Sequence, residues 1–404
     1  SFIYGAQKLE ESMMNILVPN IIFEDLGYKY VGPIDGHDIE HLLKIIKRVK
    51  NFMVGPVLIH IVTQKGKGYP PAEKNSELFH GTGPFDLKTG KQISNGKQTW
   101  SELMGSTLIT LAQKDPKIIA ITAAMTAGTG LTKFEETYPD RFFDVGIAEQ
   151  HSVTLAAGMS TKGLKPFVAI YSTFLQRALD QIIHDVALPK LPVVFCIDRA
   201  GLVGEDGATH HGAFDLSYLN FVPNMIILTP STAEELSAML FWAANYQEGP
   251  VAIRYPRGTA IHSSVHKSLT NFNPFPAIIH SNKGKIALVA CGDAFFTAEA
   301  VYNLLAKDKI PAQLIQLLSV KPLDENTLLS LASNCNYIFT FENNAVIGGM
   351  GARIAQLLAT EPVKVINFGY PDHFIAQGKN SELLDEIGFT PNKLHKQIVQ
   401  TLNE

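Results

Sequence analysis

The stretch Gly146-Ile147-Ala148-Glu149-Gln150-His151 stands between a predicted buried strand and a predicted packed helix. The strand is Phe142-Phe143-Asp144-Val145, and the helix contains the small, apolar run from Val153 to Met159. Glu149 is therefore expected at the carboxyl end of a parallel strand, where open α/β sheets bind ligands. A carboxyl group among apolar neighbours suits a residue that shares a proton with a heterocyclic nitrogen. The alternative is that Glu149 caps the helix and interacts with its dipole.

The sequence around this stretch alternates apolar strands with helical segments from residue 99 to about residue 260. Such alternation predicts an α/β fold with a doubly wound parallel sheet. The expected strands are Ile118–Thr122, Phe142–Val145, Pro166–Ile170, Pro192–Ile197, Met225–Leu228 and Val251–Arg254.

Two further α/β blocks flank this sheet, so the predicted domains are residues 1–95, 96–265 and 275–404. In the first block we expect a strand at Tyr28–Val31, a helix capped by Asp35 or Asp38, and a buried strand at Pro56–Thr63. Two strands make only half a sheet, and the rest is expected upstream of Ser1. Residues 84–98 are polar and predicted to be a linker. The last block is a smaller α/β domain.

Composition limits the kinds of partner. Hydrophobic residues make up 46% of the 404 residues and charged residues 18%, which fits a globular protein with sizeable cores. The formal net charge of −4 gives no electrostatic reason to bind nucleic acid, and no apolar run is long enough to span a membrane. Three widely spaced cysteines without metal-binding spacing favour a reducing, cytoplasm-like compartment.

Polar loops follow three of the expected strands. They carry Glu149, the run Tyr171–Arg177, and the run Asp198–Gly212. Because the carboxyl ends of parallel strands share one edge of the sheet, all three loops are expected to converge on one crevice.

The run Asp198–Gly212 is the richest of these loops in titratable groups. A loop this long is usually functional or disordered. The adjacent histidines His210 and His211 suggest zinc, but no third ligand lies nearby in the sequence. We therefore favour an acid–base or hydrogen-bonding role for them over metal binding. A solvated glycine loop is the remaining alternative.

Two weaker signals lie in the outer blocks. The basic loop Gln64–Tyr69 follows a strand, and its Lys65 could contact an anionic cofactor, although a solvated loop explains it equally well. Gly348-Gly349-Met350-Gly351 opens a helix in the last block, and helix–sheet packing explains it without a nucleotide.

Taken together, these stretches resemble the thiamine-diphosphate enzymes of the transketolase group, and among them the 1-deoxy-D-xylulose-5-phosphate synthases. A transketolase or a ketoacid-dehydrogenase β subunit would share the Glu149 region but not the two long runs in this form. The resemblance covers essentially the whole chain. It is carried by Gly32–Asp38, Gly146–His151, Tyr171–Arg177, Asp198–Leu219, Arg254–Gly258 and Phe368–Ile375.

The resemblance implies thiamine-diphosphate-dependent decarboxylation of pyruvate and condensation with D-glyceraldehyde 3-phosphate. The product would be 1-deoxy-D-xylulose 5-phosphate, a precursor of isoprenoids, thiamine and pyridoxal. Glu149 matches the carboxylate that activates the aminopyrimidine, and Phe174 matches the aromatic side chain that stacks on that ring. Tyr69 matches a cofactor contact, and His80 a histidine near the reacting centre.

The acceptor side of the site is implied in the same way. His210 and Asp206 match polar groups that handle the substrate carboxylate and hydroxyls. Bidentate guanidinium groups suit phosphate. The cluster that matches the acceptor and phosphate site is Tyr171, Arg177, Arg199 and Arg257.

One departure concerns the metal. The family binds the diphosphate through Mg²⁺, using Gly-Asp-Gly and a later Asn, and this chain has no such motif. Gly292-Asp293-Ala294 is not this metal-binding motif, because it lies in the last block and lacks the later Asn. The chain begins without Met in what looks like the middle of a helix, so we expect a fragment whose magnesium ligands lie upstream and which is inactive alone.

The implied assembly is a homodimer with the site between the first two domains. Two other functions compete with the synthase. One is a transketolase, which transfers a ketol unit without decarboxylation. The other is a non-catalytic partner subunit that lends Glu149 to a separate diphosphate-binding chain.

Overall fold

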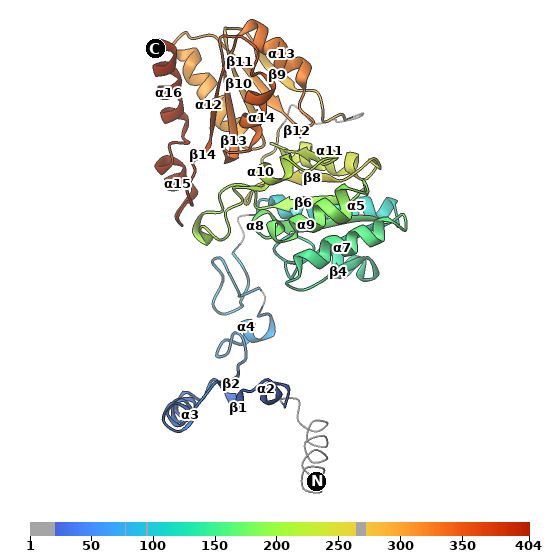
Figure 1. Cartoon of the computed structure of the whole chain (residues 1–404), viewed down its shortest axis with the longest axis vertical. Helices are drawn as coiled ribbons and strands as arrows, with labels where there is room; N and C mark the ends of the chain where they lie inside the picture. Colours follow the sequence, from blue (N-terminus) through green and yellow to red (C-terminus); the bar gives the residue numbers. More distant parts are fainter. Residues whose placement is uncertain (1–20, 77, 94–95, 264–271) are drawn as a thin grey trace. The chain divides into compact units, whose positions relative to one another are not determined.

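The chain divides into two units, one up to Asn95 and one from Gly96 to Glu404. The computed structural model describes residues 21–76, 78–93, 96–263 and 272–404. Figure 1 traces both units in sequence colours, and each is described here by itself.

The first unit has a parallel pair of strands with little buried surface. Strand β1 pairs with β2, with Lys29 opposite Val57. Asp38 caps α3, because its carboxylate accepts a hydrogen bond from the His41 amide at 2.9 Å. Helix α3 has no fully buried residue, and its apolar face is partly buried at Leu42, Ile45 and Val49. The elements are α2 (Ile21–Asp25), β1 (Lys29–Asp35), α3 (Ile39–Phe52), β2 (Val57–Val62) and α4 (Pro70–Lys74).

The second unit begins with a doubly wound sheet, as predicted. Its strand order is β12-β7-β8-β6-β5-β3-β4, and every pairing except that of β12 is parallel. All six expected strands are confirmed. The elements of this part are α5 (Trp100–Lys114), β3 (Ile118–Thr122), α6 (Thr132–Thr137), η1 (Pro139–Arg141), β4 (Phe142–Asp144), α7 (Glu149–Ser160), β5 (Lys165–Tyr171), α8 (Ser172–Leu175), η2 (Gln176–Ala178), α9 (Leu179–Gln181), η3 (Ile182–Ala187), β6 (Val194–Asp198), η4 (Gly204–Asp206), α10 (Asp215–Asn220), β7 (Ile226–Leu228), α11 (Ala233–Ala243) and β8 (Val251–Arg254).

Helices cover both faces of this sheet, which explains its continuous apolar strands. In β3, Ile119 and Ile121 pack in the core that holds α7 and η3. Ile118 and Ala120, on the other face, pack in the core that holds α5 and α11. Because successive side chains of a strand point to opposite faces, a sheet buried on both sides needs apolar residues at every position.

A second sheet follows in the order β14-β13-β10-β11-β9. Helices α12 and α16 pack against each other and against one face of this sheet (Figure 1). The core on its other face continues into the α7 side of the first sheet. The elements are β9 (Ile278–Asn282), β10 (Ile286–Cys291), α12 (Ala294–Lys307), β11 (Ala312–Leu317), β12 (Ser319–Lys321), α13 (Glu325–Asn334), β13 (Tyr337–Ala345), α14 (Met350–Leu357), β14 (Lys364–Tyr370), α15 (Asn380–Glu386) and α16 (Pro391–Asn403).

Two strands of the second unit were not predicted. Strand β9 pairs antiparallel with β11, and β12 pairs antiparallel with β7. The sheets are therefore mainly parallel, as predicted, with one antiparallel strand at an edge of each. Strand β12 has three residues, too few for a periodic pattern, and it joins the last block to the first sheet.

A buried ion pair joins the two sheets of this unit. Arg254, at the end of β8, donates to Asp215 Oδ2 from Nε at 2.5 Å and to Oδ1 from Nη2 at 3.1 Å. Its Nη1 donates to Asn343 Oδ1 in β13 at 2.5 Å, and Asn343 donates in turn to Asp293. Arg254, Asp215 and Asn343 are buried and Asp293 is partly buried, so the pair links the two sheets away from water.

No described helix combines the length and apolar character needed to cross a membrane.

Candidate active site

Glu149 is the first residue of α7 and lies almost fully buried, with 3% of its surface exposed. The chain reaches it from β4 through Gly146, whose φ of 70° is left-handed and suits glycine. Helix α7 then packs on β5. This packing brings Glu149 close to the loop that follows β5.

Arg177 is the partner of Glu149. Its Nη1 donates to Glu149 Oε1 at 2.5 Å, with the Arg177 side chain 51% exposed and that of Glu149 4% exposed. The guanidinium also lies 5.2 Å from the centre of the Phe174 ring. Arg177 therefore joins the carboxylate to the aromatic loop, a pairing that the sequence did not indicate.

Three of the ring side chains predicted for the site, Tyr171, Phe174 and His210, contact one another. Tyr171 and Phe174 are parallel, with centroids 5.4 Å apart, and His210 meets Phe174 edge-on at 5.5 Å. The Arg199 guanidinium lies 4.0 Å from the centre of the Tyr171 ring. Burial raises the pKa of Tyr171 to about 12, so its hydroxyl keeps its proton at neutral pH. The three predicted loops thus meet, as expected.

Asp206 and Arg257 form the outer part of this cluster. Arg257 Nη1 donates to Asp206 Oδ2 at 2.8 Å and to the Val203 carbonyl at 2.7 Å. His210 shares a hydrogen bond with Thr209 Oγ1 at 2.9 Å through its Nδ1. Asp206 and Arg257 are both partly exposed, so a ligand can reach them.

Sequence reasoning missed two residues beneath the site. Asp198 ends β6 fully buried and accepts from Ser101 Oγ at 2.6 Å, while its Oδ1 has no partner among the described residues. Burial raises the pKa of Asp198 to about 6. The sequence signal that could have identified Asp198 was a carboxylate at the end of an apolar strand. Gly128 is the second, because a Cβ there would lie 2.0 Å from Tyr171 Oη.

Lys65, Tyr69 and His80 belong to the first unit. Tyr69 Oη donates to the Leu87 carbonyl at 3.0 Å, and its ring packs edge-on against Phe79. Lys65 and His80 are exposed. The relation of these three residues to Glu149 stays a prediction.

The described residues offer no set of ligands for the metal. They contain no group of three or more His, Cys, Asp or Glu side chains suited to a metal ion. Asp293 accepts a hydrogen bond from Asn343 in the interior, and burial raises its pKa to about 6. The described residues therefore do not fit Mg²⁺.

The glycine turn before α14 holds one of the protein's own carboxylates. Glu342 is fully buried and accepts from the amides of Met350 at 2.7 Å and Gly351 at 3.0 Å. Gly349 allows this approach, because a Cβ there would lie 2.2 Å from Glu342 Oε2. The carboxylate fills the helix N-terminus, where an anion would otherwise bind. Packing thus explains this turn, as the sequence suggested.

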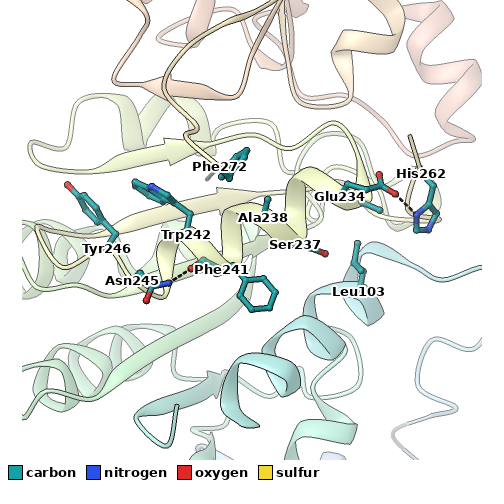
Figure 2. A pocket seen from close by; sticks show the side chains of 11 residues that line it. Leu103, Glu234, Ser237, Ala238, Phe241, Trp242, Asn245, Tyr246, His262 and Phe272 are labelled. Carbon is teal, nitrogen blue, oxygen red and sulfur yellow. Dashed lines mark hydrogen bonds and ion pairs between the residues drawn. The ribbon is translucent and has the colours of Figure 1, made fainter. Parts of the chain in front are cut away.

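A cavity of about 690 Å³ lies along α11 (Figure 2). Trp242 and Tyr246 stack at one end, and His262 pairs with Glu234 at 3.0 Å at the other. None of the predicted site residues lines it. We place the site at the strand ends, because charged and aromatic groups from three loops converge there.

Known protein families match three separate parts of the chain. The family model described as "Transketolase, pyrimidine binding domain" matches residues 96–261. "Transketolase, C-terminal domain" matches residues 277–394, and a model described as "1-deoxy-D-xylulose-5-phosphate synthase" matches residues 2–63.

Curated proteins with the name 1-deoxy-D-xylulose-5-phosphate synthase are similar over almost all of this chain. The protein of Syntrophomonas wolfei subsp. wolfei is 45% identical over 396 residues, which cover 98% of this chain and 62% of that protein. The protein of Caldanaerobacter subterraneus subsp. tengcongensis is 45% identical over 400 residues, or 98% and 64%. The chain thus spans less than two thirds of these relatives.

A solved structure described as "Split gene transketolase, inactive beta4 tetramer" is also similar. The TM-score is 0.67 at 30% sequence identity, and the match covers 75% of this chain and 97% of that one.

Proposed function

Because the chain belongs to the transketolase-like family, with 1-deoxy-D-xylulose-5-phosphate synthases as its sequence relatives, we propose that it serves that synthase reaction. Pyruvate is decarboxylated and joined to D-glyceraldehyde 3-phosphate, giving 1-deoxy-D-xylulose 5-phosphate and CO₂. The observation that carries the proposal is the cluster at the strand ends, in which the buried Glu149 carboxylate lies beside stacked aromatic rings and several arginines.

The cofactor end of the site consists of Glu149 and Phe174. Glu149 is fit to exchange a proton with a ring nitrogen, since it is shielded from water and its one described cation, Arg177, is half-exposed and can move. Phe174 has a partly exposed ring on which a flat heterocycle can pack. Thiamine diphosphate, when bound, supplies the carbon that takes up the pyruvate-derived unit.

The acceptor end consists of Arg257, Arg199, Asp206 and His210. Arg257 has two directed hydrogen bonds to the loop, to Asp206 and to Val203, that fix its guanidinium. A fixed guanidinium suits the phosphate of the acceptor. His210 contacts the Phe174 ring edge-on and is partly exposed, so its ring can donate to a hydroxyl of the substrate.

An assay of the protein purified from its source tests this function. The sample receives pyruvate, D-glyceraldehyde 3-phosphate, thiamine diphosphate and Mg²⁺, and CO₂ and 1-deoxy-D-xylulose 5-phosphate are measured together. Equal amounts of both are expected. A ketol product without CO₂ would indicate a transketolase instead. We propose that residues 1–404 alone make no product, since the described residues do not fit the metal.

A non-catalytic subunit of a two-chain enzyme is the second candidate. The observation that favours it is the match covering 97% of a chain described as a split-gene transketolase. The test is to purify the protein under mild conditions and identify any chain that co-elutes. A partner that restores product formation supports this candidate, and activity of the purified single chain excludes it.

We further propose Mg²⁺ dependence, a homodimer and a cytoplasmic location. The first two rest on the family resemblance. The location rests on three cysteines that are all free, in a chain with a formal net charge of −4. Analytical ultracentrifugation of the purified protein checks the dimer.

Arg257→Ala is expected to raise the KM for D-glyceraldehyde 3-phosphate about tenfold to a hundredfold, with the KM for pyruvate nearly unchanged. A charge-assisted hydrogen bond contributes about 1.5–3 kcal/mol, and only the acceptor carries a phosphate. Steady-state kinetics with each substrate varied in turn measure the two constants.

Arg48→Ala is the matched control for this prediction, because Arg48 is an exposed arginine of α3. It should leave both constants unchanged. An equal rise of both constants in Arg257→Ala would contradict the phosphate assignment and indicate general damage to the site.

A further inference from the structure

The loop from Gly201 to Gly212, which carries Asp206 and His210, lies against residues 370–380 of the last block. The two segments are about 170 residues apart in the sequence, yet hydrogen bonds link them directly. The Leu202 amide donates to Tyr370 Oη at 3.2 Å, Asn380 Nδ2 donates to the Leu202 carbonyl at 3.2 Å, and the Gly378 amide donates to the Gly204 carbonyl at 3.4 Å.

His211 makes the central link between the two segments. It is 5% exposed, and its Nδ1 accepts a hydrogen bond from the Val203 amide at 3.1 Å. Its Nε2 lies 3.0 Å from the Ala376 carbonyl oxygen, which can only accept. The ring must therefore be neutral, with its proton on Nε2. Both nitrogens are engaged inside the protein, so His211 has none left for a substrate.

Close packing supports these hydrogen bonds. Leu202, Tyr370 and Ile375 belong to one buried apolar cluster. A Cβ at Gly204 would lie 3.0 Å from Asn380 Oδ1, and one at Gly207 would lie 3.1 Å from Gln377 Cβ. The loop is consequently in close contact with residues 370–380.

We infer that His211 is a positioning residue that ties the loop of Asp206 and His210 to Ala376. Through this tie, residues 370–380 determine where the two side chains stand for the acceptor. The role of the loop in acceptor binding rests on the proposed function, whereas the tie itself does not. His211 differs in this from its neighbour His210, whose ring contacts Phe174 in the site.

Two substitutions of His211 each remove one of its two hydrogen bonds and keep the other. His211→Gln keeps a donor near the Ala376 carbonyl but leaves the Val203 amide without its acceptor. His211→Asn keeps the acceptor for Val203 but does not reach Ala376. In both variants we expect faster hydrogen–deuterium exchange of the amides in residues 201–207, measured by mass spectrometry on the full chain. We also expect the acceptor KM to rise about two- to tenfold, the equivalent of one lost hydrogen bond, with the pyruvate KM unchanged.

Asn380→Ala removes a second link between the same two segments, the hydrogen bond to the Leu202 carbonyl. It should give the same pattern without altering a histidine. His262→Gln is the matched control, since His262 is 60% exposed and pairs with Glu234 beside a different cavity. It should change neither exchange nor kinetics.

Unchanged exchange in residues 201–207 of both His211 variants would overturn the inference. Equal changes in both KM values, or a loss of kcat alone, would also overturn it, because they indicate general damage or a direct chemical role. If the protein purified from its source makes no product, the proposed function fails, while the exchange measurement still decides whether His211 holds the loop.

Discussion

Glu149→Gln is expected to lower kcat by about 10²- to 10⁴-fold, the contribution typical of a positioned general acid–base group. Glutamine keeps the size of the side chain and can still bond to Arg177, but it cannot take up and return a proton. The measurements are kcat and the rate at which the thiazolium carbon of bound cofactor exchanges its proton, followed by NMR in the active protein.

Folding should survive this substitution. Arg177 loses a charged partner, but its side chain is half-exposed and water can hydrate it. The matched control is Glu136→Gln, which neutralises an exposed carboxylate on α6 and should leave kcat unchanged. Proton exchange at the unaltered rate in Glu149→Gln would show that this carboxyl group does not activate the cofactor.

Asp215→Ala is expected to lower the free energy of unfolding by about 3–5 kcal/mol, because it leaves the buried Arg254 charge without its counter-ion. The Asp215 and Arg254 side chains are 0% and 1% exposed, so water cannot replace the two hydrogen bonds that the substitution removes. The hydrogen bond from Arg254 to Asn343 in β13 should weaken as well. Urea denaturation followed by circular dichroism measures the loss.

Two comparisons sharpen this test. Asp115→Ala breaks a surface pair with Lys165, 2.9 Å apart, and should cost about 1 kcal/mol or less. Replacing both members, Asp215→Leu with Arg254→Met, should recover part of the loss, because no buried charge remains. A single-variant loss no larger than that of Asp115→Ala would refute the assigned role of the pair.

The strands could be predicted wherever burial is local and continuous. Strand β6 is buried at every position, and its apolar run stands out in the sequence. Strand β9 lies at an edge and has no buried residue, and β12 has three residues. Strand β9 therefore has no continuous apolar run and β12 is too short for a pattern, so their pairing with β11 and β7 could not be predicted.

The features of the site also divide into those that follow from local sequence and those that depend on distant residues. The positions of Glu149, Tyr171 and Asp198 at strand ends follow from the sequence, because a strand and the loop after it are adjacent along the chain. The partners of these residues do not follow from it. Arg177 bonds Glu149 across 28 residues, and Ser101 bonds Asp198 across 97.

The sequence by itself determined the order of strands and helices, the glycines that turn the chain, and the loops that carry polar groups. Each depends on apolar spacing or backbone freedom within a few residues. Only the tertiary structure decided that Arg177 faces Glu149, that Arg254 joins two sheets, and that His211 is held in one tautomer. These are contacts between groups far apart in sequence, and they form only when the packed sheets bring both partners together and exclude water.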